Sequence, residues 1–200
     1  MDSEFVALAG NENIFWDIKY SSDGNILGRQ VNGYYSNKCI MTKVCLRALQ
    51  DVQKNINRLG LSLFIWDAYR PRKAVMDFWQ WSQDVNDDAT QSDYYPNLAK
   101  KDLFAKGYFS KTSNHCSGST VDLTLVDQQG QELDMGTCFD FMDPLSHPDS
   151  THVSAQAIAN RQLLREHMLS AGFEPIDTEW WHFRLIDEPF ANKIFDFDIV

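Results

Sequence analysis

Two hundred residues, 44% of them hydrophobic, are enough for one substantial core, and no Pro/Gly/Ser-rich linker divides the chain. We therefore expect a single domain over residues 1–200. The formal net charge of -10 argues against a nucleic acid or an anionic membrane as partner, because either would require a concentrated basic surface.

Targeting signals and a disulfide framework are also not evident. Residues 1–5 lack the basic and apolar regions of a signal peptide, and no apolar run approaches the length of a membrane span. A cytoplasmic protein is the simplest interpretation, whereas removal of a signal peptide would give the same appearance in a periplasmic protein. Cys39, Cys45, Cys116 and Cys138 are too scattered for a disulfide scaffold, so we expect reduced, mostly buried thiols.

The first half of the chain predicts interleaved strands and helices. Residues 13–20 alternate as an early strand. Residues 45–59 follow helical spacing and stop at Gly60, a residue type that commonly ends helices. Residues 61–69 predict a hydrophobic strand, and Pro71 suits the first turn of the next helix.

Two side chains in these elements have both a structural and a functional interpretation. Tyr20, at the end of the first strand, either closes the core or reaches a site. Arg70 stands at a strand-to-helix junction, where a rigidly held guanidinium can hydrogen-bond an oxyanion or a carboxylate. A surface ion pair of Arg70 with Asp67 or Asp77 is the alternative.

The rest of the chain continues the same organisation. Residues 84–97 lose periodicity and predict a long surface loop, which is either a lid or a solvated insertion. A strand over 121–126, a helix capped by Ser154 and an aromatic strand over 178–186 follow. Because the interleaving lacks βαβ regularity, we expect an α+β fold.

Three residues of the second half are candidates for one divalent cation. His115 precedes a turn at Gly118, Asp122 follows that turn, and His182 lies far downstream. Two imidazoles and one carboxylate are typical of a catalytic zinc site, because three protein ligands leave a position for water. His115 alone is more often a hydrogen-bonded loop histidine, and Cys116 is a rival ligand that would suit a structural site better.

Glu179 is the candidate base for that water. In an ideal strand Glu179 and His182 would point to opposite faces. We therefore expect Glu179 on the loop that leads into the strand, or on a bulge, and His182 on the strand proper. Apolar surroundings would raise the pKa of a buried Glu179 and a nearby cation would lower it, so the sequence leaves the net direction open.

Several short motifs join these residues into one pattern. Ser-x-His-x-x-Gly-x-x-x-Asp spans 113–122, Glu-x-Trp-His spans 179–182, and Trp-Asp-Ala-Tyr-Arg-Pro spans 66–71. Further matching stretches are Asp-Leu-Thr-Leu at 122–125, Met-Gly-Thr at 135–137, Phe-Asp at 139–140 and Asp-Glu-Pro-Phe at 187–190. Together they resemble the zinc D-Ala-D-Ala dipeptidases of the VanX type over nearly the whole chain.

The resemblance implies an α+β fold with a mostly antiparallel central sheet flanked by helices, related to zinc D-Ala-D-Ala carboxypeptidases and the Hedgehog signalling domain. It implies one zinc ion per chain on His115, Asp122 and His182. Glu179 would match the general base that acts on the metal-bound water, and Arg70 would match the stabiliser of the tetrahedral intermediate.

The resemblance also implies how a substrate is held. Ser113 would bind the substrate carboxylate, and Asp140 and Tyr20 would bind the free amino end. Thr120 stands where the family usually has alanine, which would add a hydroxyl near the site.

The implied function is zinc-dependent hydrolysis of the small dipeptide D-Ala-D-Ala to two D-alanines. A peptidoglycan D,D-carboxypeptidase or endopeptidase of the same fold is one alternative, which would need an open cleft and export. A non-catalytic zinc-bearing binding module is the other, and it would need no base. The presence of both Glu179 and Arg70 favours an enzyme.

Overall fold

A five-stranded sheet forms the centre of the molecule in a computed structural model that describes residues 2–10 and 12–200. Its strands, in spatial order, are β2 (Phe15–Trp16), β4 (Ser62–Asp67), β5 (Thr120–Val126), β7 (His182–Leu185) and β6 (Phe173–Pro175). The β2–β4 pair is parallel and the other three pairs are antiparallel. A separate antiparallel pair joins β1 (Phe5–Ala7) to β3 (Ile40–Thr42). The expected α+β fold with a mostly antiparallel central sheet is confirmed.

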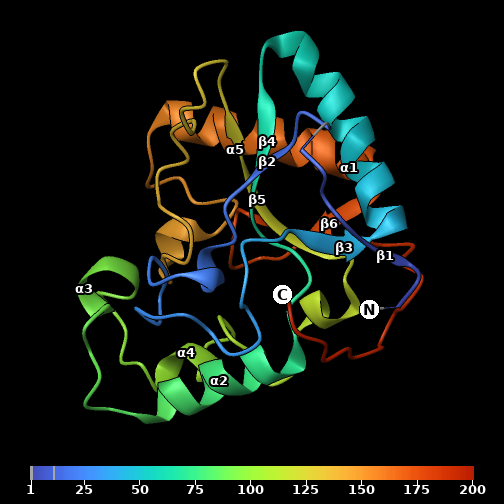
Figure 1. Ribbon diagram of the computed structural model, residues 1–200. Coiled ribbons are helices and arrows are strands. Elements are labelled where there is room, and N and C mark those ends of the chain that lie inside the picture. The colour runs from blue at the N-terminus through green and yellow to red at the C-terminus, as the bar shows by residue number, and fades with distance from the viewer. Residues whose placement is uncertain (1, 11) are drawn as a thin grey trace.

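The helices lie at two ends of the molecule (Figure 1). At the upper end of that view α1 (Lys43–Ile56) and α5 (Ala155–Ser170) lie together, and at the lower end are α2 (Arg72–Gln83), α3 (Gln91–Tyr94) and α4 (Asp102–Ala105). Short 3-10 helices connect these elements: η1 (Lys19–Ser21), η2 (Asn57–Leu59), η3 (Asn114–Ser117) and η4 (Pro144–Ser146). None of the helices in the described part of the chain has the length and apolar character that crossing a bilayer requires.

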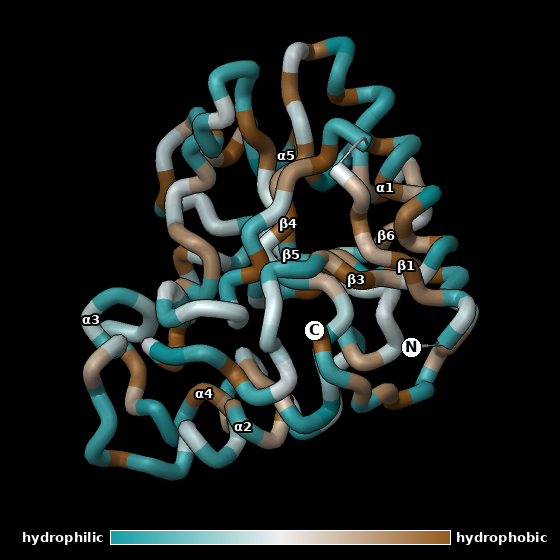
Figure 2. The backbone as a smooth tube through the Cα atoms, viewed as in Figure 1, coloured by the Kyte–Doolittle hydropathy of each residue, from teal (hydrophilic) through white to brown (hydrophobic). Residues whose placement is uncertain are grey.

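Helix α1 forms where the hydrophobic spacing predicts it. Thr42 caps its start by accepting a hydrogen bond from the Cys45 backbone N–H, and Gly60 follows η2 with a φ of 73°. Hydrophobic and hydrophilic positions alternate along α1 in Figure 2, because one stripe of the helix packs on the core and the other faces water. The buried stripe comprises Cys45, Leu46, Leu49, Val52, Gln53 and Ile56.

Strand β5 is the centre of the sheet, and all seven of its residues are buried. Its side chains alternate, so Val121, Leu123 and Leu125 point to one face and Asp122 points to the other. Asp122 lies opposite His182 of β7 on one side and opposite Asp67 of β4 on the other. The register of β4 shifts between Ile65 and Asp67, and this bulge brings Asp67 level with Asp122.

Three predicted elements are wrong in extent. The strand expected over 13–20 is limited to Phe15–Trp16, because Ser21 N–H bonds to Ile18 C=O and closes η1 around Tyr20. Residues 84–97 are not only a surface loop, since they contain α3 and the buried Tyr95, which packs edge-on against Trp81 at 5.7 Å. The strand expected over 178–186 is likewise confined to β7.

The four cysteines are free, as expected. Cys39, Cys45 and Cys116 are buried, and Cys138 is exposed. The single domain over residues 1–200 and the cytoplasmic location stay predictions.

Candidate active site

A tight turn returns the chain from His115 to β5. Ser113 begins η3, and its Oγ accepts a hydrogen bond from the His115 backbone N–H at 3.3 Å. Gly118 ends η3 with a φ of 83°, and a Cβ at this position would lie 2.2 Å from the Phe5 ring. Both the left-handed backbone and the close ring exclude a larger residue, so glycine fixes how His115 approaches Asp122.

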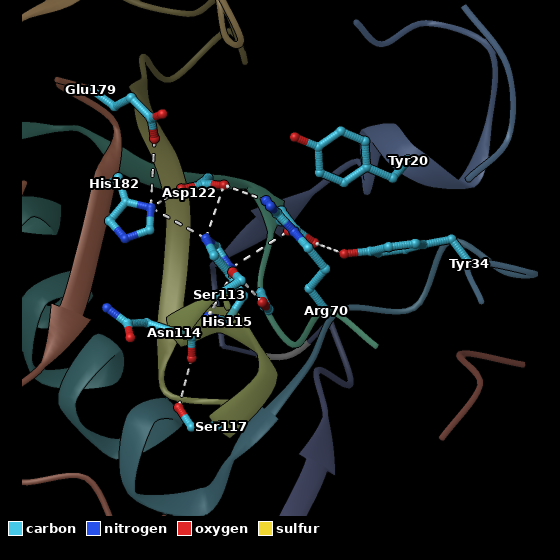
Figure 3. Close-up of polar contacts among 12 residues, drawn as sticks. Tyr20, Tyr34, Arg70, Ser113, Asn114, His115, Ser117, Asp122, Glu179 and His182 are labelled. Atoms are coloured by element: carbon cyan, nitrogen blue, oxygen red, sulfur yellow. Dashed lines mark hydrogen bonds and ion pairs between the residues drawn. The ribbon is translucent and has the colours of Figure 1, made fainter. Parts of the chain in front are cut away.

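His115, Asp122 and His182 converge as the sequence predicts (Figure 3). His115 Nε2 lies 3.2 Å from Asp122 Oδ2 and 3.3 Å from His182 Nδ1, and His182 Nδ1 lies 3.0 Å from Asp122 Oδ1. Ligand atoms about 2.0–2.2 Å from a tetrahedral zinc ion would be separated by about 3.3 Å. One carboxylate oxygen of Asp122 and one nitrogen from each ring lie within 4.8 Å of one another, so a single ion could bind all three side chains. Cys116 is not a member of this group.

The protein orients His115 through its second ring nitrogen. His115 Nδ1 lies 2.7 Å from the Ala68 carbonyl oxygen, which accepts its proton and leaves Nε2 free to bind a metal. Burial lowers the pKa of His182, which favours the neutral form that a metal requires. Burial by itself would raise the pKa of the Asp122 carboxyl, but His115 and His182 hold that pKa well below its usual value.

Glu179 lies beside this group and outside the strand. It precedes β7 by a turn through Trp180 and Trp181, so the expectation of Glu179 on the loop and His182 on the strand is confirmed. Glu179 Oε2 lies 3.7 Å from His182 Nδ1. Burial, together with the negative charges of Asp122 and Asp140, raises the pKa of Glu179 well above its usual value, and Arg70 opposes the shift. The sequence left open whether the pKa of Glu179 is raised or lowered, and the protein's own groups raise it.

Arg70 lies on the opposite side of Asp122 from His182 (Figure 3). Its Nε donates to Asp67 Oδ2 at 2.9 Å, and its Nη2 lies 3.4 Å from Asp122 Oδ2. The predicted partner Asp67 is correct, but a surface pair is wrong, because both side chains are buried. Asp77 instead forms a two-pronged pair with Arg29.

Asp67 belongs to the site, although the sequence indicated it only as a possible partner of Arg70. Its Oδ2 lies 3.5 Å from His115 Nδ1 as well as accepting from Arg70, and its Oδ1 accepts from the Tyr34 hydroxyl at 2.7 Å. A fully buried carboxylate is stable only with several partners. An aspartate that interrupts a hydrophobic strand was the signal in the sequence.

Tyr20 and Asp140 form a second pair at the site. The Tyr20 hydroxyl lies 3.0 Å from both carboxylate oxygens of Asp140 and donates to them. Burial raises the pKa of Asp140 to about 8, although Arg70 opposes the shift. Asp140 has a φ of 61°, in the left-handed region that aspartate tolerates better than most residues. The Tyr20 ring also lies 5.1 Å from the Arg70 guanidinium carbon, so the pair of Tyr20 and Asp140 is in contact with the group around Asp122 through Arg70.

One pocket of about 150 Å³ brings all of the predicted site residues together. It is smaller than the roughly 300–1,000 Å³ of most small-molecule sites. The predicted residues that line it are Tyr20, Arg70, Ser113, His115, Asp122, Asp140, Glu179 and His182.

One wall of this pocket could not be identified from the sequence. Tyr108 and Phe109, in the segment 107–114, line it together with Met142 and Ile176. The expected lid 84–97 does not line the pocket, nor does Thr120, whose buried hydroxyl has no hydrogen-bond partner among the described residues. The extra hydroxyl therefore faces the interior and not the pocket.

Several known proteins are similar to this chain. The family model of peptidase M15, described as D-ala-D-ala dipeptidase, matches residues 1–200. The chain is 41% identical to a D-alanyl-D-alanine dipeptidase of Enterococcus faecalis, over 92% of each protein. It is 42% identical to one of Streptomyces coelicolor, over 93% of each. Among solved structures, VanYB in complex with D-Alanine-D-Alanine is a distant likeness, with 19% identity and a TM-score of 0.44 over 79% of this chain and 78% of that one.

Proposed function

Because the chain belongs to the peptidase M15 family of D-Ala-D-Ala dipeptidases, we propose that it hydrolyses free D-Ala-D-Ala to two D-alanine molecules. We propose one zinc ion per chain, held by His115, Asp122 and His182. The observation that carries the proposal is one small pocket lined by these three residues together with Glu179 and Arg70.

The donor set fits zinc. Two imidazole nitrogens and one carboxylate oxygen, which all lie within 4.8 Å of one another, suit a tetrahedral ion with one position open. When bound there, zinc would polarise the peptide carbonyl and lower the pKa of a water molecule at the open position. The Ala68 carbonyl keeps His115 in the tautomer that this binding needs.

Glu179 is the proposed general base and acid. Its carboxylate is next to the ligand His182 without belonging to the ligand set, so it is free to accept a proton from the attacking water. The same carboxyl then delivers that proton to the leaving amine as the peptide bond breaks.

Arg70 is the proposed stabiliser of the negative charge that develops on the carbonyl oxygen. Asp67 fixes the guanidinium through Nε, and the bulge at the end of β4 holds Asp67 in turn. Donors fixed before the reaction begins need no reorganisation as charge develops, so they can stabilise the transition state strongly.

The two ends of the pocket suit the two charged ends of a free dipeptide. We propose that Ser113 binds the substrate carboxylate, whereas Asp140 and Tyr20 bind its ammonium group. An ammonium group beside Asp140 would favour the ionised form of this buried carboxyl. An acylated amine cannot provide that charge, so Asp140 would keep only its bonds from the Tyr20 hydroxyl, and this supports discrimination against longer substrates.

A comparison of three substrates tests the proposal. The zinc-loaded enzyme should hydrolyse D-Ala-D-Ala rapidly and should act poorly on N-acetyl-D-Ala-D-Ala and on peptidoglycan pentapeptide. Free D-alanine is measured for each substrate at equal concentration. Preference for the pentapeptide would instead identify a D,D-carboxypeptidase, and inactivity on all three would favour a binding module.

A further inference from the structure

Arg161 of α5 is a buried cation that lies outside the pocket. Only 4% of it is exposed, and none of the ion pairs among the described residues includes it. Its guanidinium instead donates three hydrogen bonds to backbone carbonyls, from Nε to Met135 at 2.7 Å, from Nη1 to His147 at 3.0 Å and from Nη2 to Leu145 at 3.0 Å. All three acceptors belong to the segment 135–147.

The next arginine of the same helix makes a different kind of contact. Arg165, one turn later, forms an ordinary exposed pair with Asp149 at 2.8 Å. A charge removed from water without a carboxylate partner is costly unless every donor is well used. Arg161 uses its donors to hold both ends of one segment, so its position in the fold is tied to that segment.

The segment 135–147 carries Asp140 at its middle. Asp140 has a left-handed backbone, and its carboxylate faces Tyr20 in the pocket. A non-glycine residue in this conformation persists only where the surroundings hold it. The bonds from Arg161 to Met135 and Leu145 fix the chain on both sides of Asp140.

The same segment also holds the residue next to Glu179. Trp180 N–H donates to the Ser146 carbonyl at 3.0 Å, and Trp180 Nε1 donates to Thr137 Oγ1 at 2.8 Å. The Arg161 guanidinium carbon lies 5.7 Å from the centre of the Trp180 ring. Arg161 therefore contacts both the segment that bears Asp140 and the residue that follows Glu179.

We propose that Arg161 is a positioning residue that sets the distance between Asp140 and Glu179, and thereby the preference for substrates with a free amine. The inference rests on the proposed function and deepens it. Arg161 touches no substrate and acts only through the segment 135–147. If Arg161 merely stabilised the fold, its loss would affect substrates with and without an amine equally.

The test compares D-Ala-D-Ala with N-propionyl-D-alanine, which has hydrogen in place of the substrate amine. The measured quantity is the ratio of kcat/KM for the two compounds, or the inhibition constant of the analogue where its turnover is too slow. Arg161→Met should lower this ratio by roughly 10- to 100-fold, since a small misplacement of a binding group has effects of that size. The loss should appear mainly as a higher KM for the dipeptide, with zinc content unchanged. Arg161→Lys, which restores the charge and some of the donors, should lie between wild type and Arg161→Met.

Arg165→Met is the matched control, because it removes an arginine from the same helix without touching the segment 135–147. It should keep the wild-type ratio. Should Arg161→Met fail to fold, Arg161→Lys and Thr137→Val still test the proposal. Thr137→Val removes the bond from Trp180 Nε1 and the bond between Thr137 Oγ1 and Ser146 Oγ, both of which hold the segment 135–147, so it should lower the kcat/KM ratio in the same direction.

If the Arg161 variants are active and keep the wild-type ratio of kcat/KM for the two compounds, the proposed role of Arg161 is rejected and the proposed function remains. A wild-type enzyme that does not cleave D-Ala-D-Ala would reject both.

Discussion

Asp122 and His182 are directly paired residues of neighbouring strands, and Asp122 Oδ1 lies 3.0 Å from His182 Nδ1. The register of β5 against β7 therefore positions two of the three candidate metal ligands. A slip of one residue would turn His182 to the opposite face of the sheet, because side chains alternate along a strand. A bound metal would in turn stabilise the correct register.

His182→Ala should lose most of the bound zinc, because two remaining ligands cannot complete the site. Elemental analysis of the purified variant measures this directly. His152→Ala, which changes an exposed histidine, should keep one zinc ion per chain. Full zinc content in His182→Ala would show that His182 is not a ligand.

Glu179→Ala should keep its zinc and lose turnover by about 10²–10⁴-fold, the usual contribution of a general base. Its carboxylate lies beside the ligand set, so its removal changes proton transfer and not metal affinity. The measurement is kcat on D-Ala-D-Ala with metal content determined on the same sample. Glu174→Ala, an exposed carboxylate on β6, serves as the control. Activity of Glu179→Ala within a few-fold of wild type would point to another base.

Arg70→Lys should lower kcat by about 10²–10³-fold although the positive charge is kept. A lysine ammonium cannot pair with Asp67 and at the same time present a planar fork to the pocket. Arg29→Lys is a matched control, since Arg29 makes a two-pronged pair with Asp77 away from the pocket. Equal activities of the two variants would exclude a role for Arg70 in the reaction.

Asp140 should make the metal-free protein less stable as the pH rises. Its pKa is raised from its ordinary value of 3.8 to about 8 in the folded protein, so between these values the folded state binds more protons than the unfolded state. The free energy of unfolding then falls with pH, by at most about 1.4 kcal/mol per pH unit. Asp140→Asn should remove this contribution and give a flatter pH dependence over that range.

Urea unfolding of the metal-free wild type and Asp140→Asn, at several pH values between about 5 and 8, measures this slope. Asp149→Asn, at an exposed carboxylate, should keep the wild-type slope. Identical slopes in wild type and Asp140→Asn would show that Asp140 is already ionised across the range.

The metal group could be predicted from the sequence because its parts lie in short local patterns. The turn at Gly118 and the alternation of β5 determine where His115 and Asp122 point. Glu179 could be placed outside the strand because it precedes His182 by three positions, and strict alternation would have put the two side chains on opposite faces. Periodicity also identified the helices α1, α2 and α5.

What could not be predicted depends on contacts between distant segments. Tyr108 and Phe109 lie in a stretch without periodicity, and Phe109 is held at the pocket wall by rings from other segments, among them Phe78 of α2 at 5.1 Å. The bulge that brings Asp67 to Asp122 is likewise a property of two paired strands and not of either strand alone. Arg161 has no signal in its own helix, since its acceptors are backbone carbonyls of another segment.

The left-handed backbone of Asp140 has a consequence for how this enzyme can evolve. Aspartate codons change to asparagine or glycine codons by a single base, and these two residues are the ones that adopt a positive φ most readily. One point mutation can therefore delete the carboxylate while the loop keeps its shape. If Asp140 binds the substrate amine as proposed, such a change would remove that contact without changing the backbone, and a lineage under selection for acylated peptides would have a direct route to them through Asp140.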